Sequence, residues 1–207
     1  PFATIDPNVG VVLVPDARVD KLAQLTNSEK KIYATFDFVD IAGLVKGASA
    51  GEGLGNKFLS HIREVDAVLY VLRAFKNTDI INTQQDTNPL REKEILDVEL
   101  ILKDLDTINK RIGGLDGDVR AVKNLPASRH GYLKEMDVLK KAKDFLSQEK
   151  VLIDCDFTDE EKFVLKGFQM LTFKPRLYLL NGKASEVSGE ILEIFKKNNW
   201  QYLVIDI

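Results

Sequence analysis

Short apolar runs alternate with amphipathic stretches along much of this chain. Runs rich in Val, Ile, Leu and aromatic residues predict β-strands at residues 9–14, 32–39, 67–72, 177–180 and 202–205. Helical spacing predicts helices at residues 16–25, with Asp16 as N-cap, and at 56–63 and 190–197. We expect the first two strands to pair antiparallel, and the later, continuous apolar strands to be buried on both faces. The pattern predicts an α/β fold with a mostly parallel sheet.

Residues from about 79 to 172 break this rhythm. An apolar stripe, Ile95, Val98, Leu102, Leu105 and Ile112, predicts a coiled-coil-like helix over residues 89–112 that ends at Gly113-Gly114. A polar stretch, 116–131, precedes a second amphipathic helix at 132–150, and a capping box from Thr158 to Glu161 opens a third. We interpret 79–172 as a helical arm inserted between two parts of one α/β domain, 1–78 and 173–207.

Composition narrows the functional classes. The chain has 207 residues, of which 44% are hydrophobic and 29% charged, with a formal net charge of −3. This balance is typical of a soluble globular protein and gives no reason to expect DNA binding. No apolar run approaches the ~20 residues that span a bilayer, so no membrane association is expected. The single cysteine, Cys155, excludes an internal disulfide, fits a reducing, cytoplasmic location, and is expected to be packed or idle.

Charged residues in the arm allow two interpretations. Basic side chains cluster there, with acidic ones between them: Lys110, Arg111, Arg120, Lys123, Arg129, Lys134, Lys140, Lys141 and Lys143. A solvated helix face is the default interpretation. The alternative is a contact surface for RNA or protein.

Candidate chemistry is concentrated around Asp40, which follows an apolar run and precedes Ile-Ala-Gly43. An Asp at a strand end can hold a magnesium-bound water, and a Gly lets a backbone N–H approach a phosphate without a side chain between them. The pattern therefore fits a phosphate-and-metal corner. A plain strand-to-helix turn is the default interpretation of Asp-x-x-Gly taken alone.

Longer strings around this corner resemble a known family. They are PFATIDPNVGVVLVPD at residues 1–16 and VDIAGLVKGAS followed by GEGLGNKFL within residues 39–59, with weaker similarity through Arg73-Ala-Phe75 and beyond. They resemble the YchF family of Obg-like ATPases, whose members are P-loop nucleotide hydrolases with an inserted helical arm and a C-terminal TGS domain. The resemblance implies ATP, or alternatively GTP, as substrate, Mg²⁺ as cofactor, and association with the ribosome through ribosomal RNA or protein.

Two parts of that family are absent from these residues. No Gly-x-x-x-x-Gly-Lys-Ser/Thr occurs in the sequence, and no TGS domain follows. We therefore expect a fragment of a longer protein. Without the Gly-rich loop and its Lys, most of the cradle for the β- and γ-phosphates is missing, so this chain alone is expected to be inactive.

The resemblance assigns roles to particular residues. It places Thr4 and Asp40 at the magnesium site and the Gly43 N–H against the γ-phosphate. Leu44 stands where Ras-like enzymes carry a water-orienting Gln. This implies direct attack of water, positioned by backbone groups and magnesium, with slow turnover. His61 and His130, the only histidines, are expected to be structural or solvated.

Base recognition is implied at Asn181 and Gly182. The family reads Asn-x-x-Glu where GTPases read Asn-Lys-x-Asp, but here the fourth position is Ala184, and the nearest acid is Glu186. Ala offers no acceptor for guanine, so GTP preference is disfavoured. The alternative is that the loop places Glu186 at that position instead.

Three functional hypotheses follow. The first is slow ATP hydrolysis coupled to binding of the ribosome or a translation factor. The second is a non-catalytic ribosome-binding module that nucleotide merely orders. The third is a GTP-preferring switch.

Overall fold

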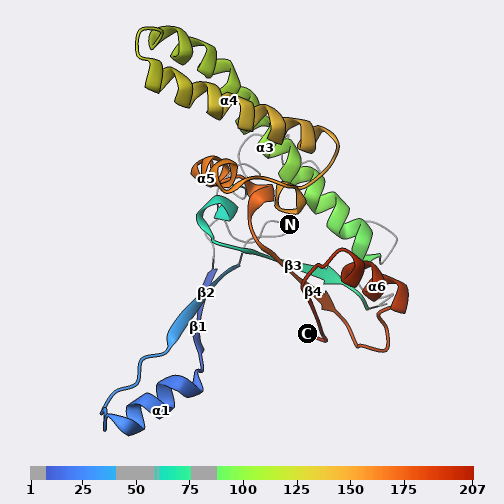
Figure 1. Ribbon diagram of the computed structural model, residues 1–207. Coiled ribbons are helices and arrows are strands. Elements are labelled where there is room, and N and C mark those ends of the chain that lie inside the picture. The colour runs from blue at the N-terminus through green and yellow to red at the C-terminus, as the bar shows by residue number, and fades with distance from the viewer. Residues whose placement is uncertain (1–7, 41–58, 60, 76–87) are drawn as a thin grey trace. The chain divides into compact units, whose positions relative to one another are not determined.

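The computed structural model describes residues 8–40, 59, 61–75 and 88–207. These belong to two compact units, Pro1–Gly43 and Leu44–Ile207. Figure 1 shows the elements of both. Of the helix predicted at 56–63, residue 59 and residues 61–63 are described and are helical, and the helix continues to residue 64. The other residues of that prediction lie outside the described part of the chain.

The first unit is a β-ribbon with one helix. Strands β1 (Asn8–Val14) and β2 (Ala34–Asp40) pair antiparallel, with Asn8 opposite Asp40 and Val14 opposite Ala34. Helix α1 (Ala17–Leu25) connects them. Asp16 caps α1 by accepting the backbone N–H of Arg18 at 2.8 Å. The predicted antiparallel pair and the N-cap are confirmed, and β2 begins two residues later than the pattern indicated.

The second unit contains a three-stranded parallel sheet. Strands β3 (Val68–Arg73), β4 (Arg176–Asn181) and β5 (Tyr202–Ile205) lie in the order β3-β4-β5. Helix α6 (Gly189–Lys197) connects β4 to β5. The register places Arg73 beside Asn181 and Asn181 beside Ile205, so the carboxyl ends of all three strands lie at one edge. The predicted parallel sheet is confirmed.

The described residues cover one face of this sheet. Tyr70, Leu72, Tyr178 and Leu180 are buried, whereas Leu69, Val71 and Leu203 on the opposite face are 37%, 55% and 49% exposed. The hydroxyl of Tyr70 donates to Asp97 of the arm, and the ring of Tyr178 lies 5.2 Å from that of Phe195 in α6. Both covering helices therefore pack on the same face. The prediction that these strands are buried on both faces is wrong for β3 and β5 in the described part of the chain. In the central strand β4, Leu177 on the opposite face is exposed, but Leu179 is buried.

The arm is a long helical hairpin followed by shorter elements. Its helices are α3 (Pro89–Ala121), α4 (Pro126–Ser147) and α5 (Asp159–Gly167), with the 3₁₀ turns η1 (Leu152–Asp154) and η2 (Leu171–Phe173) between α4 and β4. Figure 1 shows α3 and α4 side by side. The capping box predicted between Thr158 and Glu161 is confirmed.

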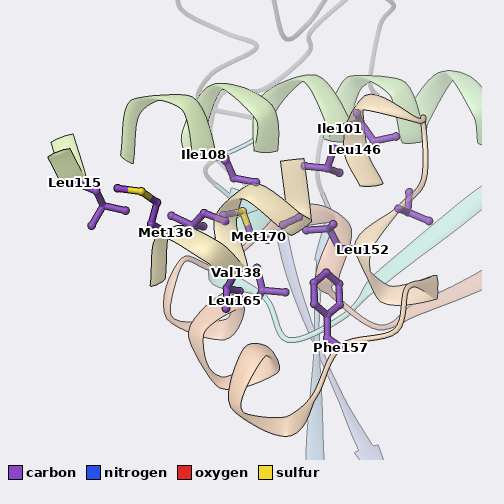
Figure 2. Close-up of a cluster of buried hydrophobic side chains, with 13 residues drawn as sticks. Ile101, Ile108, Leu115, Met136, Val138, Leu146, Leu152, Phe157, Leu165 and Met170 are labelled. Carbon is purple, nitrogen blue, oxygen red and sulfur yellow. The ribbon is translucent and has the colours of Figure 1, made fainter. Parts of the chain in front are cut away.

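A hydrophobic core holds the arm together. α3 contributes Ile101, Ile108 and Leu115, and the segment between α4 and β4 adds Leu152, Phe157, Leu165 and Met170 (Figure 2). The stripe predicted on the second helix is confirmed, because Met136, Leu139, Ala142 and Leu146 are all buried.

The stripe predicted on α3 is partly wrong. Val98 and Leu102 are 41% and 47% exposed, while Leu105 and Ile112 pack partly against the core. The buried face instead includes charged residues, Lys93, Asp97 and Asp104. A count of apolar positions misses this face, because carboxylates and ammonium groups can be buried when they are hydrogen-bonded.

The predicted end of α3 at Gly113-Gly114 is also wrong. The helix continues to Ala121, and α4 begins at Pro126, so the predicted polar stretch 116–131 is mostly helical. Each Gly costs about 1 kcal/mol relative to Ala inside a helix. Here buried Leu115 and an ion pair between Arg111 and Asp118 stabilise the helix across this segment.

Asp104 attaches α3 to the turn before β4. It is fully buried, and its carboxylate accepts the backbone N–H groups of Leu171 at 2.9 Å and Thr172 at 2.8 Å, and the Thr172 hydroxyl at 2.7 Å. Burial raises the pKa of Asp104, and these hydrogen bonds act in the opposite direction. The arm is thus fixed to the chain that returns to the sheet.

Asp104→Asn is expected to lower the free energy of unfolding by about 2 kcal/mol. The amide would turn an N–H₂ toward a buried donor, and an unsatisfied buried donor costs about 1–3 kcal/mol. Urea denaturation of the full-length protein measures this loss. Thr172→Val, which removes one of the three hydrogen bonds, should cost less. Wild-type stability in Asp104→Asn would contradict this role.

Candidate functional site

Asp40 is the last residue of β2, and its side chain is exposed. It lies opposite Asn8 in the ribbon, so its carboxylate is at the end of the strand pair. An exposed carboxylate at a strand end fits the hard oxygen ligand that Mg²⁺ or its bound water prefers. Thr4, Gly43 and Leu44 lie outside the described residues, and their roles stay predictions.

Asn181 ends β4 at the carboxyl edge of the parallel sheet. Its backbone carbonyl accepts the N–H of Ala74 at 2.8 Å, and its side-chain oxygen accepts the N–H of Ile207 at 3.1 Å. These bonds join it to the chain that follows both neighbouring strands. Ligands of open α/β sheets bind at this edge, so the geometry suits a base-binding role for Asn181.

Gly182 is required by the backbone that surrounds it. Its φ is +154°, and a Cβ at this position would lie 3.0 Å from the nitrogen of Phe75 and 3.1 Å from the carbonyl carbon of Ala74. Its N–H donates to the carbonyl of Ile205 at 2.9 Å. A side chain would displace the chain after β3 or the loop itself, so only Gly fits.

The loop after Gly182 is closed by Glu186. The Glu186 carboxylate accepts the N–H of Lys183 at 3.0 Å, and the Glu186 N–H donates to the carbonyl of Lys183 at 2.8 Å. Ala184 lies within this turn and is exposed. The Glu186 carboxylate therefore lies in the same loop as Ala184. Both alternatives stay open: the site has no acidic group, or Glu186 supplies it.

A buried ionic cluster at the root of the arm escaped the sequence analysis. Asp97 accepts the Lys93 ammonium at 2.6 Å, the Tyr70 hydroxyl at 3.0 Å and the Arg176 guanidinium at 3.3 Å. The Lys93 ammonium also lies 4.1 Å from the centre of the Trp200 ring. In the sequence, the four-residue spacing of Lys93 and Asp97 resembles an ordinary surface pair.

A second contact links the arm to the loop after β4. Glu92, in the first turn of α3, accepts the backbone N–H of Arg73 at 2.9 Å. The next N–H, that of Ala74, donates to the carbonyl of Asn181. The end of β3 is therefore held by the arm through Arg73 and by Asn181, at the end of β4, through Ala74. A displacement of α3 would act on the Asn181 loop through two hydrogen bonds.

Other candidate groups have structural roles or no described partner. His130 is exposed and His61 half-buried. The thiol of Cys155 contacts the carbonyl of Val151 at 3.4 Å, and burial raises its pKa, so the predicted idle thiol fits the structure. Among the described residues, no three His, Cys, Asp or Glu side chains form a group that could hold a metal. Nor does the described part contain a helix long and apolar enough to cross a membrane.

Comparisons with known proteins identify the family. The model of the 50S ribosome-binding GTPase family matches residues 1–106. A relative in Bacillus subtilis, described as ribosome-binding ATPase YchF, is 44% identical over 91% of this chain and 50% of its own length. A relative of the same description in Escherichia coli O157:H7 is 41% identical over 87% of this chain and 48% of its own length. The chain thus spans about half the length of the curated relatives it matches.

A solved structure agrees with these matches. The YchF GTPase of Schizosaccharomyces pombe superimposes with a TM-score of 0.77 at 31% identity, over 100% of this chain and 57% of that protein. The match includes the parallel sheet and the helical arm, because it covers the whole chain. The fold is therefore the α/β fold of the P-loop GTPases, and the chain belongs to the YchF family of the 50S ribosome-binding GTPases.

Proposed function

We propose that the protein containing this chain binds ATP, hydrolyses it slowly with Mg²⁺, and couples the reaction to ribosome binding. The relatives in B. subtilis and E. coli are described as ribosome-binding ATPases. The observation that carries the proposal is Asp40 at the end of β2, directly before Ile-Ala-Gly43. Ribosome binding would place the protein in the cytoplasm. We keep the division into 1–78, 79–172 and 173–207 as part of the proposal.

Each proposed site residue has one role. Asp40 and Thr4 would hold Mg²⁺, which when bound neutralises charge on the phosphates. The N–H of Gly43 would donate to a γ-phosphate oxygen as negative charge develops there. Asn181 and the backbone of Gly182 would bind the adenine base.

The hydrolytic step needs no side-chain base in this proposal. The oxygen of water forms a bond to the γ-phosphorus, the bond from that phosphorus to the ADP oxygen breaks, and the water proton passes to phosphate or solvent. Leu44 cannot orient this water by hydrogen bonding. Slow turnover in the absence of a partner follows from that missing contact.

The distal arm is the proposed ribosome-binding surface. Arg120, Lys123 and Arg129 are exposed near the tip of the α3–α4 hairpin. Phosphate groups of RNA attract such side chains, and their contacts weaken as salt rises. By contrast, Lys110, Lys134 and Lys141 pair with the acids Asp106, Glu160 and Glu161. The proposed contact therefore belongs to the tip rather than to the whole arm.

Asp40→Asn in the full-length protein is expected to lower magnesium-dependent ATP hydrolysis at least tenfold, which corresponds to about 1.4 kcal/mol. The amide keeps the shape of the side chain but loses the charge that would hold Mg²⁺. Single-turnover hydrolysis at saturating Mg²⁺ measures the effect. Asp37→Asn is the matched control, because Asp37 lies on the same strand opposite Val11. Unchanged turnover in Asp40→Asn would remove Asp40 from the site.

A non-catalytic ribosome-binding module is the competing function. The Glu92–Arg73 and Ala74–Asn181 contacts favour this function, because they connect the proposed base site to α3. Nucleotide binding without hydrolysis would then be sufficient to change the position of the arm. Hydrolysis by the full-length protein with and without ribosomes separates the two. Turnover that ribosomes accelerate supports the ATPase. Ribosome affinity that depends on nucleotide, without measurable turnover in either condition, supports the binding module.

A further inference from the structure

The distal end of the arm has no core of its own. Leu115 is the last buried side chain of α3, and Met136 is the first of α4; no residue between them is buried. Figure 2 shows Leu115 and Met136 together at one end of the arm's core. Beyond this pair only the ring of Tyr132, among the described residues, packs partly against the core, and the rest is held by the helices themselves and by surface contacts. Segments with few buried apolar contacts are the first to open in a native protein.

Three glycines lie where α3 leaves the core. They are Gly113, Gly114 and Gly117, and all three are inside the helix. A Cβ added at any of them would meet nothing within 4 Å, so packing does not require glycine there. Glycine is the weakest helix former after proline, because it loses the most backbone freedom on ordering. The helix is therefore weakened at this point without a gain in packing.

Arg111 connects the two sides of this glycine segment. Its guanidinium donates to Asp118, on the far side of the glycines, at 2.9 Å. It also binds Glu135 of α4 through two nitrogens, at 2.5 and 3.2 Å, and lies 6.0 Å from the centre of the Tyr132 ring. One side chain thus joins α3 before the glycines, α3 after them, and the facing helix.

We propose that residues 113–117 are a hinge in the arm and that Arg111 is the latch that keeps it straight. With the latch closed, α3 continues through the glycines as one helix. With the latch released, the distal segment, residues 116–131, bends or frays at the glycines, while the arm's core from Met136 to Leu146 stays folded. The contacts of Arg111 explain why α3 stays helical through Gly113-Gly114, where its sequence predicts an end.

Hydrogen exchange of the full-length protein tests the hinge. Arg111→Ala is expected to raise exchange rates of amides in residues 112–131 at least tenfold and to leave those of residues 136–146 within about twofold. Asp118→Asn, which removes only the bridge across the glycines, should act in the same region. Lys110→Ala is the matched control, because the Lys110 ammonium pairs with Asp106 at 2.8 Å and does not cross the glycines.

A second set of variants removes the hinge itself. Replacing all three glycines by Ala (Gly113→Ala, Gly114→Ala and Gly117→Ala) should slow exchange in 112–131, because open space surrounds each position. In that background Arg111→Ala should have little effect, so the two changes are not additive. Additive effects would overturn the hinge. Faster exchange through residues 136–146 in Arg111→Ala would also overturn it, since Arg111 would then be an ordinary contact of the whole arm.

Discussion

Asp97→Ala is expected to lower the free energy of unfolding by about 3–5 kcal/mol. The Asp97 carboxylate lies between Lys93 and Arg176, and the side chains of these two cations are only 8% and 4% exposed. Removing the carboxylate leaves the buried Lys93 ammonium without its counter-ion and takes one of two carboxylates from Arg176, which keeps Asp154 at 2.7 Å. The Tyr70 hydroxyl loses its acceptor as well. Desolvated, unpaired charge is among the most destabilising defects in a folded protein.

Urea denaturation of the full-length protein measures this loss. Asp106→Ala is the matched control, because Asp106 also pairs with two lysines of α3, but its side chain is 43% exposed. An exposed pair of this kind contributes about 0–1 kcal/mol. A loss below 1 kcal/mol in Asp97→Ala would mean that water reaches the cluster and replaces the carboxylate.

Asp97 also shows why the fold is only partly readable from the sequence. Local signals were sufficient for the strands, for the Asp16 cap and for the capping box at Thr158, because each depends on residues adjacent in the chain. The buried face of α3 depends on partners far away in the sequence. Asp104 binds Thr172, 68 residues later, and Asp97 binds Arg176, 79 residues later. Spacing along one helix cannot reveal such partners.

The end of α3 illustrates the same limit at shorter range. Gly113-Gly114 is a sound local signal for a helix end. It is overridden by Arg111, which reaches Glu135, 24 residues later, and by Leu115, which packs into the arm's core. Tertiary contacts of this kind outweigh a propensity difference of about 1 kcal/mol per residue.

The candidate site likewise contains some features that the sequence predicts and others that it does not. The positions of Asp40 and Asn181 at strand ends were predictable because the residues of each strand define it. The contacts that hold the chain around Asn181 were not predictable. Glu92 reaches the end of β3 from the arm, and Gly182 is needed because of the backbone at Ala74 and Phe75. Neither contact has a signal in the sequence near the residue that it supports.

Ala184→Asp in the full-length protein is expected to strengthen GTP binding relative to ATP by about 1–3 kcal/mol. Guanine offers two N–H donors to an acidic side chain at this position, and Ala cannot accept them. A site that gains both hydrogen bonds away from water discriminates by that amount. Ala184 is exposed in the turn that Glu186 closes, so a longer side chain fits without displacing a packed neighbour.

Glu186 provides the competing outcome. If its carboxylate already serves as the acidic group, Ala184→Asp changes little and Glu186→Gln alters the ratio of ATP to GTP affinity instead. Gln is the informative replacement, because it keeps an oxygen that can accept the N–H of Lys183 and so preserves the turn. Ser185→Asp is the control for added charge at a neighbouring position.

Titration of ATP and GTP against the wild type and these three variants decides between the alternatives. A change in both affinities by the same factor would indicate a loosened loop rather than altered base recognition. If the wild-type protein binds GTP tenfold more tightly than ATP, both alternatives, the one based on Ala184 and the one based on Glu186, are wrong. The acidic position would then be unnecessary for guanine selectivity, and Asn181 with the backbone of Gly182 would have to supply it.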